Sequence, residues 1–432
     1  MIKKYEFDNG LKLVYETPFN NNKYSSLMIG VNFGSIHEPK NMKGAAHFIE
    51  HMCFKGNKHI KECTEISKNF DKYGAYLNAY TDKKYTNYII SCNNDNLIPC
   101  FKILVSMILF SIFEKKDFDK EYNVVIEENL RDKQDFNDQL NTMIDKFIYD
   151  GSNYKLPIDD LDYHKNKLKN SELFKLYKEY YVPENITVSI CSNISYNKII
   201  KMIKSSHLSK ENNSKININV PLSIKSQENY HIQTKIDKLT NVTYIAFSFK
   251  TCGYLNEDIH VLNLIKTILS SGMSSRLFTN FREKFGLTYA SDCTANFFEH
   301  MGDITLTCET NYDKLFINNG IMQIFINIIN DIKNKPIKID EINKAKGLID
   351  GEHKILLNDN KLICESNLIN TINDNLNYSI KDEFKLKIKN IDYTLIKTVI
   401  NKYFNKNNLT VTIISNKSIN NSKIKKYIEK IL

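Results

Sequence analysis

Two histidines and a glutamate in the segment His47-Phe48-Ile49-Glu50-His51 have the spacing of a metal-binding helix. Helical residues advance about 100° each, so His47 and His51 stand one turn apart on one face, with Glu50 beside them. Two imidazoles in this arrangement can bind one Zn²⁺, and the carboxylate can accept a proton from water that the ion makes more acidic. The order His-x-x-Glu-His is the inverse of the more familiar zinc helix. The segment therefore predicts metal-assisted hydrolysis.

A third protein ligand is expected from an acidic segment further along the chain. Glu121 and Glu128 are seven residues apart, so two helical turns place them on one face. We expect Val124 and Val125 to share this inward face, whereas Glu127 projects about 100° away from it. Glu128 is the predicted ligand. The alternative interpretation is an acidic helix face that is solvated and binds no metal.

Two segments with glycines carry a family resemblance, one that precedes the two histidines and one that contains them. They are Gly34-Ser35-Ile36-His37-Glu38 and Gly44-Ala45-Ala46-His47-Phe48-Ile49-Glu50-His51-Met52-Cys53-Phe54-Lys55-Gly56. With these segments the chain resembles the pitrilysin/insulinase family of zinc peptidases. The resemblance is to the half-length branch that includes mitochondrial processing peptidase and its bacterial relatives, and it covers nearly the whole chain. It implies a zinc metalloendopeptidase with an α+β fold.

The resemblance also assigns roles to individual residues. It implies one Zn²⁺ per chain, bound by His47, His51 and Glu128. Glu50 would be the general base, and Glu121 would match the family's second acidic residue, which supports the site without binding the metal. Glu128 follows the second histidine at the distance that the family uses.

The segment Gly74-Ala75-Tyr76-Leu77-Asn78-Ala79-Tyr80-Thr81 is similar to a strand that the family uses to bind substrate. An extended peptide can add to the edge of such a strand through main-chain hydrogen bonds. Asn78 and Ala79 are therefore predicted to bind substrate. The alternative is an ordinary strand end that follows a turn.

The second half of the chain contains Phe281-Arg282-Glu283-Lys284-Phe285-Gly286-Leu287-Thr288-Tyr289, which resembles the family's C-terminal Arg/Tyr motif. By resemblance, Arg282 and Tyr289 complete the active site, where they bind the substrate carbonyl and stabilise the oxyanion. Without the family, an arginine and a tyrosine at this spacing are usually a surface and a core residue.

The two halves also resemble each other. Asn69-Phe70-Asp71-Lys72-Tyr73-Gly74 recurs, with one insertion, as Asn280-Phe281-Arg282-Glu283-Lys284-Phe285-Gly286, close to half the chain away. A duplicated unit predicts two homologous domains. We place the zinc-binding domain at 1–208, a polar linker at 209–228, and a repeat domain without the zinc motif at 229–432.

Each half is predicted to combine strands with helices. A strand over Leu11–Tyr15 follows the turn signal Asn9-Gly10, and the strand over Ile186–Ile190 recurs as Leu409–Ile414. The fold class is therefore α+β, with a mainly antiparallel sheet packed against helices in each domain.

Composition is consistent with two hydrophobic cores, since 42% of the 432 residues are hydrophobic. The apolar run Ile103–Phe113 is too short to cross a bilayer and predicts a buried helix. The net charge of +9 comes from scattered lysines, which indicates a solvated surface and no nucleic-acid partner. A strand near the N-terminus leaves no room for a targeting segment, so we expect a cytoplasmic protein, or an organelle-matrix protein whose presequence has been removed.

Nine cysteines without paired Cys-x-x-Cys spacing predict reduced thiols. Cys53 lies two residues beyond His51 and therefore faces another side of the helix. We expect Cys53 to be a small core residue and not a further zinc ligand.

The resemblance leaves the assembly open. A homodimer that encloses a chamber is expected, because one chain carries every expected part, with Arg282 acting at the partner's zinc site. The alternatives are a heterodimer with a non-catalytic paralogue and a scaffold protein without catalysis. The run Tyr154-Lys155-Leu156-Pro157-Ile158-Asp159 keeps the family's Leu-Pro-Ile but lacks the surrounding histidine and glycines, so the resemblance implies no loop geometry there.

Overall fold

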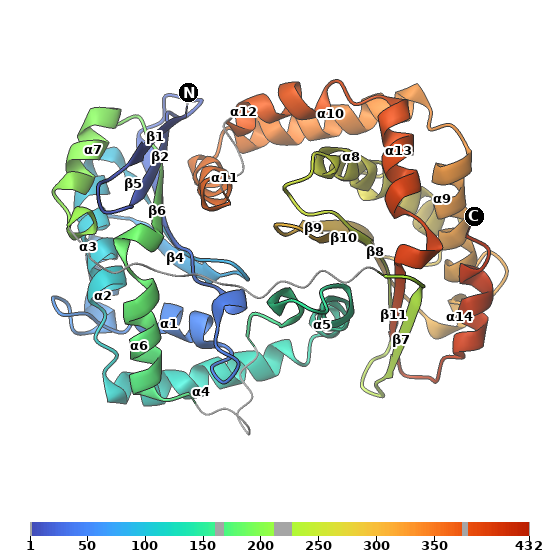
Figure 1. The fold of residues 1–432 in the computed structure, drawn as a ribbon, viewed down its shortest axis with the longest axis horizontal. Coiled ribbons are helices and arrows are strands. Elements are labelled where there is room, and N and C mark those ends of the chain that lie inside the picture. The colour runs from blue at the N-terminus through green and yellow to red at the C-terminus, as the bar shows by residue number, and fades with distance from the viewer. Residues whose placement is uncertain (1, 160–167, 211–226, 374–378, 432) are drawn as a thin grey trace. The chain divides into compact units, whose positions relative to one another are not determined.

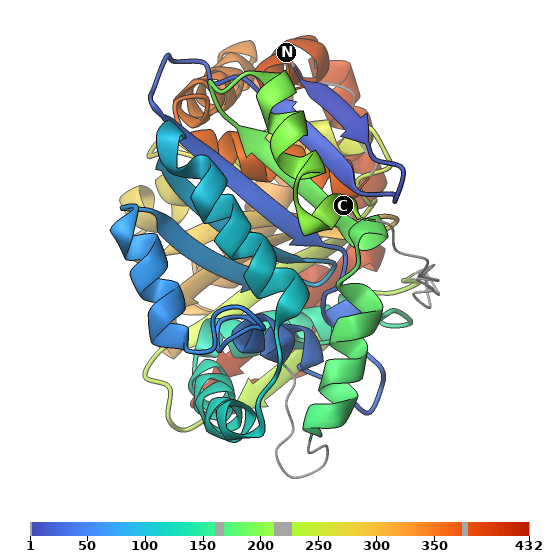
Figure 2. The same cartoon turned by 90° about the vertical axis from the view of Figure 1, so that its left-hand side faces the viewer.

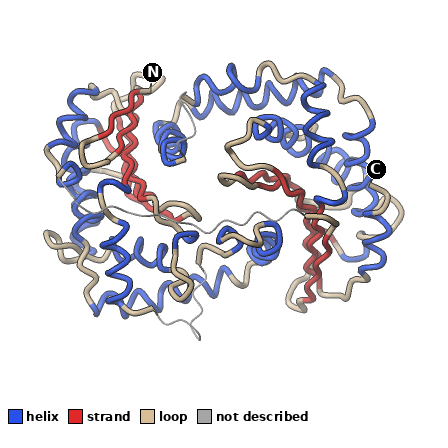
Figure 3. The backbone as a smooth tube through the Cα atoms, viewed as in Figure 1, coloured by secondary structure: helices blue, strands red, loops and turns tan. Residues whose placement is uncertain are grey.

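The computed structural model describes residues 2–159, 168–210, 227–373 and 379–431 (Figure 1). The described residues form two β-sheets, each packed with helices (Figure 3). The predicted class, α+β with two homologous domains, is confirmed. No described helix is long and apolar enough to cross a membrane.

The first sheet has the strand order β1-β2-β6-β3-β5-β4, so β1 and β4 are its edges. Strands β2 and β6 are parallel, and the other neighbours are antiparallel. The strands are β1 (Lys3–Glu6), β2 (Lys12–Glu16), β3 (Tyr24–Val31), β4 (Tyr76–Thr81), β5 (Thr86–Asn93) and β6 (Ile186–Cys191).

Helices cover one face of the first sheet and enclose its main core. Figure 2 shows α2, α3, α6 and α7 in front of the strands. The predicted buried helix is α3, whose apolar residues lie in this core. The helices are α1 (Ala45–Cys53), α2 (Cys63–Lys72), α3 (Leu97–Phe110), α4 (Lys115–Asp132), α6 (Asn170–Tyr180) and α7 (Tyr196–Lys204).

The second sheet has the order β7-β11-β8-β10-β9. Its strands are β7 (His231–Ile236), β8 (Thr243–Thr251), β9 (Ser291–Phe297), β10 (Gly302–Thr310) and β11 (Leu409–Ser415). Its helices include α8 (Asp258–Ser270), the π-helix η6 (Phe278–Lys284), α9 (Ile321–Asn334), α10 (Ile339–Leu356), α13 (Tyr393–Tyr403) and α14 (Asn421–Ile428). A separate core lies between these helices and the sheet.

The two sheets repeat one topology. Strands β2-β6-β3-β5-β4 correspond in order to β7-β11-β8-β10-β9, and the pairs β2–β6 and β7–β11 are both parallel. The repeated sequence segments also match, because Gly74 after α2 and Gly286 after η6 have φ of 56° and 55°. Glycine is favoured there, since a side chain strains this left-handed backbone.

One helix of each half packs on the sheet formed by the other half. Helix α5 (Phe136–Ile148) contacts β8 and β11, whereas α11 (Asn360–Ile372) contacts β2, β3 and β6. Chain contacts accordingly define two interleaved units, Met1–Asp132 with Leu156–Pro221 and Lys354–Lys381, and Lys133–Lys155 with Leu222–His353 and Asp382–Leu432. The domain limits 1–208 and 229–432 expected from the sequence thus follow the order of the two repeats along the chain and differ from these contact-defined units. Most of the expected linker 209–228 lies outside the described residues.

Buried carboxylates hold α5 and α11, the two exchanged segments, on the sheets that they cover. Glu16 on β2 is fully buried and accepts a hydrogen bond from Asn367 of α11 at 2.8 Å. It also forms an ion pair with Lys381 at 2.9 Å. In the second unit, the phenol of Tyr149, which follows α5, donates to buried Asp303 on β10. Glu16 also accepts a hydrogen bond from Ser379, and Asp303 accepts hydrogen bonds from Asn296 and Thr305. Losing the contact with the exchanged segment would therefore remove one of several hydrogen bonds to a buried carboxylate, which is costly.

Candidate metal centre

Helix α1 carries both histidines and is fixed at its N-terminus by a buried carboxylate. Glu38 accepts hydrogen bonds from the main-chain N–H groups of Gly44 at 2.9 Å and Ala46 at 2.8 Å. These N–H groups at the helix start have no partner within the helix, and a negative charge there is favourable. The other face of α1 is anchored by Phe48 and Met52 in the core.

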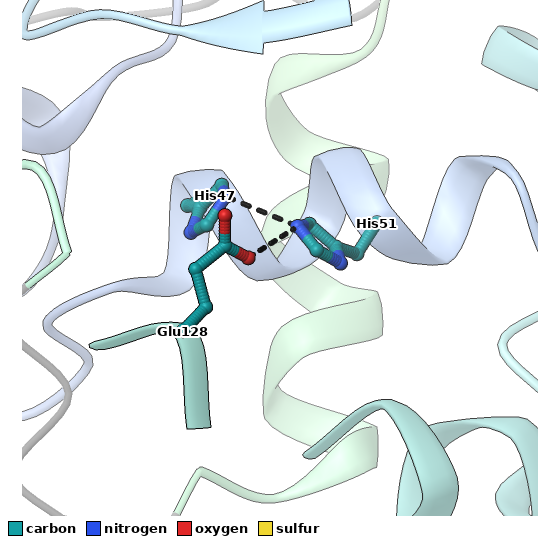
Figure 4. Close-up of side chains that lie close together, drawn as sticks. All are labelled: His47, His51 and Glu128. Atoms are coloured by element: carbon teal, nitrogen blue, oxygen red, sulfur yellow. Dashed lines mark hydrogen bonds and ion pairs between the residues drawn. The ribbon is translucent and has the colours of Figure 1, made fainter. Parts of the chain in front are cut away.

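The structure brings His47 and His51 of α1 together with Glu128 of α4 (Figure 4). The Nε2 atoms of the two imidazoles are 3.0 Å apart, and His51 Nε2 is 3.7 Å from Glu128 Oε2. One ligand atom from each residue lies within 4.8 Å of the other two. Among the described residues this is the one group of histidine, cysteine or acidic side chains close enough to hold a metal ion.

These three residues fit a Zn²⁺ site. Donor atoms bound at about 2.0–2.2 Å around one tetrahedral ion lie roughly 3.3 Å from one another, close to the separations seen here. Two imidazoles and a carboxylate are also the donor set of known catalytic zinc sites, which keep a fourth position for water or substrate. Two imidazole nitrogens that face each other at 3.0 Å can share one proton or bind one cation.

Glu121 supports His51 from its outer side. Its Oε1 lies 2.8 Å from His51 Nδ1, and its other oxygen pairs with Lys55. The inward face predicted for α4 is confirmed for buried Glu121 and Val125, whereas Val124 is 48% exposed. The prediction for Val124 is wrong, because the buried face of α4 is centred on the side of Val125 and leaves Val124 outside it. That face consists of Phe118, Glu121, Tyr122, Val125 and Asn129.

Glu50 lies beside the histidines and is only 8% exposed. Its Oε2 accepts a hydrogen bond of 2.7 Å from Thr81 Oγ1 at the end of β4. Burial raises the pKa of the Glu50 carboxyl above its ordinary value, although the Thr81 hydrogen bond and both histidines oppose this effect. A carboxylate with a raised pKa is better able to accept a proton.

Four side chains at the centre were not assigned a role from the sequence: Glu38, Lys55, Thr81 and Asp159. Glu38, Lys55 and Thr81 lie in the segments that carry the family resemblance, so their position in the sequence could have indicated that they belong to the site. Asp159 lies in the segment that departs from the family pattern. Its Oδ2 is 3.7 Å from Nδ1 of His47.

Asn78 and Ala79 lie on β4, which is an edge strand of the first sheet and contacts α1. Asn78 is exposed, and its Oδ1 accepts a hydrogen bond from the N–H of Ala79 at 2.9 Å. Its Nδ2 donates to the phenol oxygen of Tyr76. Asn78 and Ala79 therefore lie on an edge strand of the first sheet, and their role in substrate binding stays a prediction.

Arg282 and Tyr289 belong to the second unit. The Arg282 guanidinium lies over the rings of Phe278 and Tyr289, with its Cζ 5.2 and 4.8 Å from the two ring centres. Tyr289 is 86% exposed. Both residues line a hollow of about 310 Å³ whose wall also includes Asp292 and Glu309. Their predicted role in catalysis stays a prediction.

The cysteines agree with the expectation of reduced thiols, since all nine are free. Cys53 is fully buried in the first core, and burial raises the pKa of its thiol to about 12. It is therefore a core residue, as predicted.

Comparisons of sequence place the chain among peptidases. Residues 15–158 match the family described as Insulinase (Peptidase family M16), and residues 167–348 match the Peptidase M16 inactive domain. "Uncharacterized zinc protease YmxG" of Bacillus subtilis is 29% identical over 317 residues, which cover 73% of this chain and 75% of that protein. An "Uncharacterized zinc protease" of Rickettsia bellii is 29% identical over 342 residues, covering 78% and 79%.

Solved structures share the fold. A protease from Helicobacter pylori superposes with a TM-score of 0.89 at 18% identity, covering 96% of this chain and 99% of that one. The first half of the periplasmic protease PqqL from Escherichia coli gives 0.82 at 17% identity, covering 100% and 96%. The two matched family models, over residues 15–158 and 167–348, show that the chain belongs to the insulinase family of peptidases, family M16.

Proposed function

We propose that this protein is a zinc-dependent endopeptidase that cleaves unstructured peptides. The observation that carries the proposal is the convergence of His47, His51 and Glu128 from two helices, with Glu50 beside them. His47, His51 and Glu128 would hold the ion, and Glu50 would not bind it. The relatives named zinc proteases support the same metal.

A bound Zn²⁺ would polarise the scissile carbonyl and make water more acidic. Glu50 accepts the proton of the attacking water and then gives it to the nitrogen of the leaving amine. Thr81 holds one oxygen of this carboxylate by its 2.7 Å hydrogen bond, which fixes the orientation of the base. Glu121 accepts from Nδ1 of His51 and so keeps Nε2 of that ring for the metal.

The substrate binds as an added strand along β4. Edge position leaves main-chain groups of β4 without a neighbouring strand, and the contact between α1 and β4 brings this edge next to Glu50. Main-chain pairing accepts many sequences, whereas a folded protein offers no free strand to pair. Asn78 and Ala79 would contact the peptide, because both lie on this edge strand.

We also propose that two copies of the chain close into a chamber. In this homodimer Arg282 and Tyr289 of one chain would bind the substrate carbonyl and oxyanion at the zinc centre of the other. The Arg282 guanidinium lies over the rings of Phe278 and Tyr289, and this contact keeps the cation and the phenol next to each other, which suits such a role. A heterodimer with a non-catalytic paralogue is the alternative.

The test of the zinc peptidase is Glu50→Gln. Glutamine can accept the hydrogen bond from Thr81 but cannot take up a proton, so we expect the variant to bind one zinc per chain and to lose turnover by about 10²- to 10⁴-fold. Bound metal is measured by elemental analysis and turnover with an unstructured fluorogenic peptide. Glu127→Gln, an exposed change on α4, is the matched control and should leave both values unchanged.

Equal turnover in wild type and Glu50→Gln would exclude Glu50 as the general base. Zinc binding without any turnover in the wild type would instead support a scaffold protein.

A further inference from the structure

Each histidine of the zinc centre has one ring nitrogen toward the metal position and a carboxylate near the other nitrogen. For His51 this carboxylate is Glu121, whose oxygen lies 2.8 Å from Nδ1. For His47 the nearest one is Asp159, with Oδ2 3.7 Å from Nδ1. From this arrangement we propose that Asp159 is the positioning residue of His47. Its carboxylate accepts a hydrogen bond from Nδ1–H of His47, so that Nε2 is left to bind the metal.

Unsatisfied polar atoms on both sides support this assignment. His47 Nδ1 and both carboxylate oxygens of Asp159 are shielded from solvent, and none has a hydrogen-bond partner among the described residues. The side chains of His47 and Asp159 are only 16% and 12% exposed. A buried carboxylate without a donor is costly, and so is a buried N–H without an acceptor. A shift of Asp159 by less than 1 Å would join them at about 2.9 Å, the usual N–H···O distance.

The main chain of Asp159 is already held at the site. Asn129, which follows the proposed ligand Glu128 on α4, is buried and donates from its Nδ2 to the carbonyl oxygen of Asp159. This hydrogen bond ties the segment before residue 160 to the helix that supplies the third ligand. The position of Asp159 therefore does not depend on its side chain alone.

The chemistry of the metal explains why a carboxylate is needed here. An imidazole binds a cation through one nitrogen only when the proton sits on the other, and an acceptor at that proton fixes the tautomer and the ring orientation. A carboxylate also compensates the positive charge that the ion places on the ring. His47 and His51 would then be oriented in the same way, each by a carboxylate at its Nδ1.

This inference rests on the proposed zinc site, and the experiment separates the two. Zinc affinity of the full-length protein is measured by competition with a chelator of known affinity, for wild type, Asp159→Ala, Asp159→Asn and the control Glu127→Gln. Loss of such an outer carboxylate typically weakens metal binding about 10- to 100-fold, which we expect for Asp159→Ala. Asp159→Asn should fall between Asp159→Ala and wild type, because it keeps an acceptor without the charge, and Glu127→Gln should match wild type.

A second readout follows the ring itself. In zinc-loaded protein with ¹⁵N-labelled histidine, the Nδ1–H signal of His47 should be present in wild type and should shift or vanish in Asp159→Asn and Asp159→Ala. Wild type that binds no stoichiometric zinc would overturn the proposed function. Wild-type zinc affinity and an unchanged His47 signal in both folded Asp159 variants would overturn only the role of Asp159; circular dichroism checks their folding.

Discussion

The carboxylate of Glu38 is predicted to hold the start of the zinc helix, and Glu38→Gln tests this prediction. Glu38 is 4% exposed, and each of its oxygens accepts one main-chain N–H at the beginning of α1. Glutamine keeps the size of the side chain but offers one acceptor, so its amide group must face the second N–H. Burial raises the pKa of the Glu38 carboxyl to about 8, so exchange is measured at about pH 9, where the group is charged. At that pH the variant's helix start loses one hydrogen bond to a charged group and one favourable negative charge.

The expected cost follows from those two losses. A hydrogen bond to a charged group contributes about 1.5–3 kcal/mol, and a negative charge at a helix N-terminus adds some tenths of a kcal/mol or more. We expect the local opening free energy of α1 to fall by about 2–3 kcal/mol. This corresponds to a roughly 30- to 150-fold loss of protection from hydrogen exchange, since about 1.4 kcal/mol is tenfold.

Hydrogen exchange followed by mass spectrometry measures this loss directly, on peptides that cover α1. A local method is preferable because a protein of two units need not unfold in a single transition. Glu65→Gln, an exposed change on α2, serves as the control and should not alter protection of α1. Protection of α1 in Glu38→Gln within threefold of wild type would refute the reasoning.

Two further predictions concern assembly and pH. Glu50→Gln and Arg282→Ala chains, each inactive alone, should recover about a quarter of wild-type turnover when they are mixed and re-equilibrated. Half of the dimers then contain one chain of each kind, and each such dimer has one intact site. No recovery of turnover would contradict a site shared between two chains. Burial and the charge of Lys84 lower the pKa of His37 to about 4, and the N–H of Gly34 donates to its Nδ1 at 3.1 Å. The unfolded chain binds this proton near pH 6.5, so stability is full above that pH and is lost as the pH falls toward 4, by about 2 kcal/mol at pH 4.5. His37→Asn keeps an acceptor and should lack this loss in urea unfolding at pH 7 and 4.5, whereas equal losses in both proteins would exclude His37 as its source.

The sequence was sufficient to predict those parts of the centre that depend on spacing within one element. His47, Glu50 and His51 share a helix, so the helical period alone predicts that they lie together. Helical spacing within the acidic segment selected Glu128 as the ligand, and the resemblance supported that choice. The helical period of α4 cannot by itself specify where α4 packs against α1. Asp159 could not be found this way, since it lies in the segment where the family pattern is lost.

The strands were predictable for a similar reason, whereas the exchange of helices was not. The segments Ile186–Ile190 and Leu409–Ile414 lie within β6 and β11, and Leu11–Tyr15 lies within β2 except for Leu11, which precedes that strand. Helix α5 buries Leu140, Ile144 and Ile148 at helical spacing, which predicts a helix with one apolar side. That pattern does not say which sheet receives the apolar side, so the packing of α5 on β8 and β11 could not be predicted from it.

The swapped positions of α5 and α11 affect how this polypeptide can be synthesised and cleaved. Helix α11 completes the first sheet only after residues 192–359 have been synthesised behind its last strand. During that interval the nascent N-terminal half exposes the sheet face that α11 later covers. Such late, long-range closure slows folding and increases dependence on chaperones. After a protease cut between the two halves, α5 of the N-terminal fragment would still pack on the second sheet and α11 of the C-terminal fragment on the first. The two fragments should therefore stay associated until they are denatured.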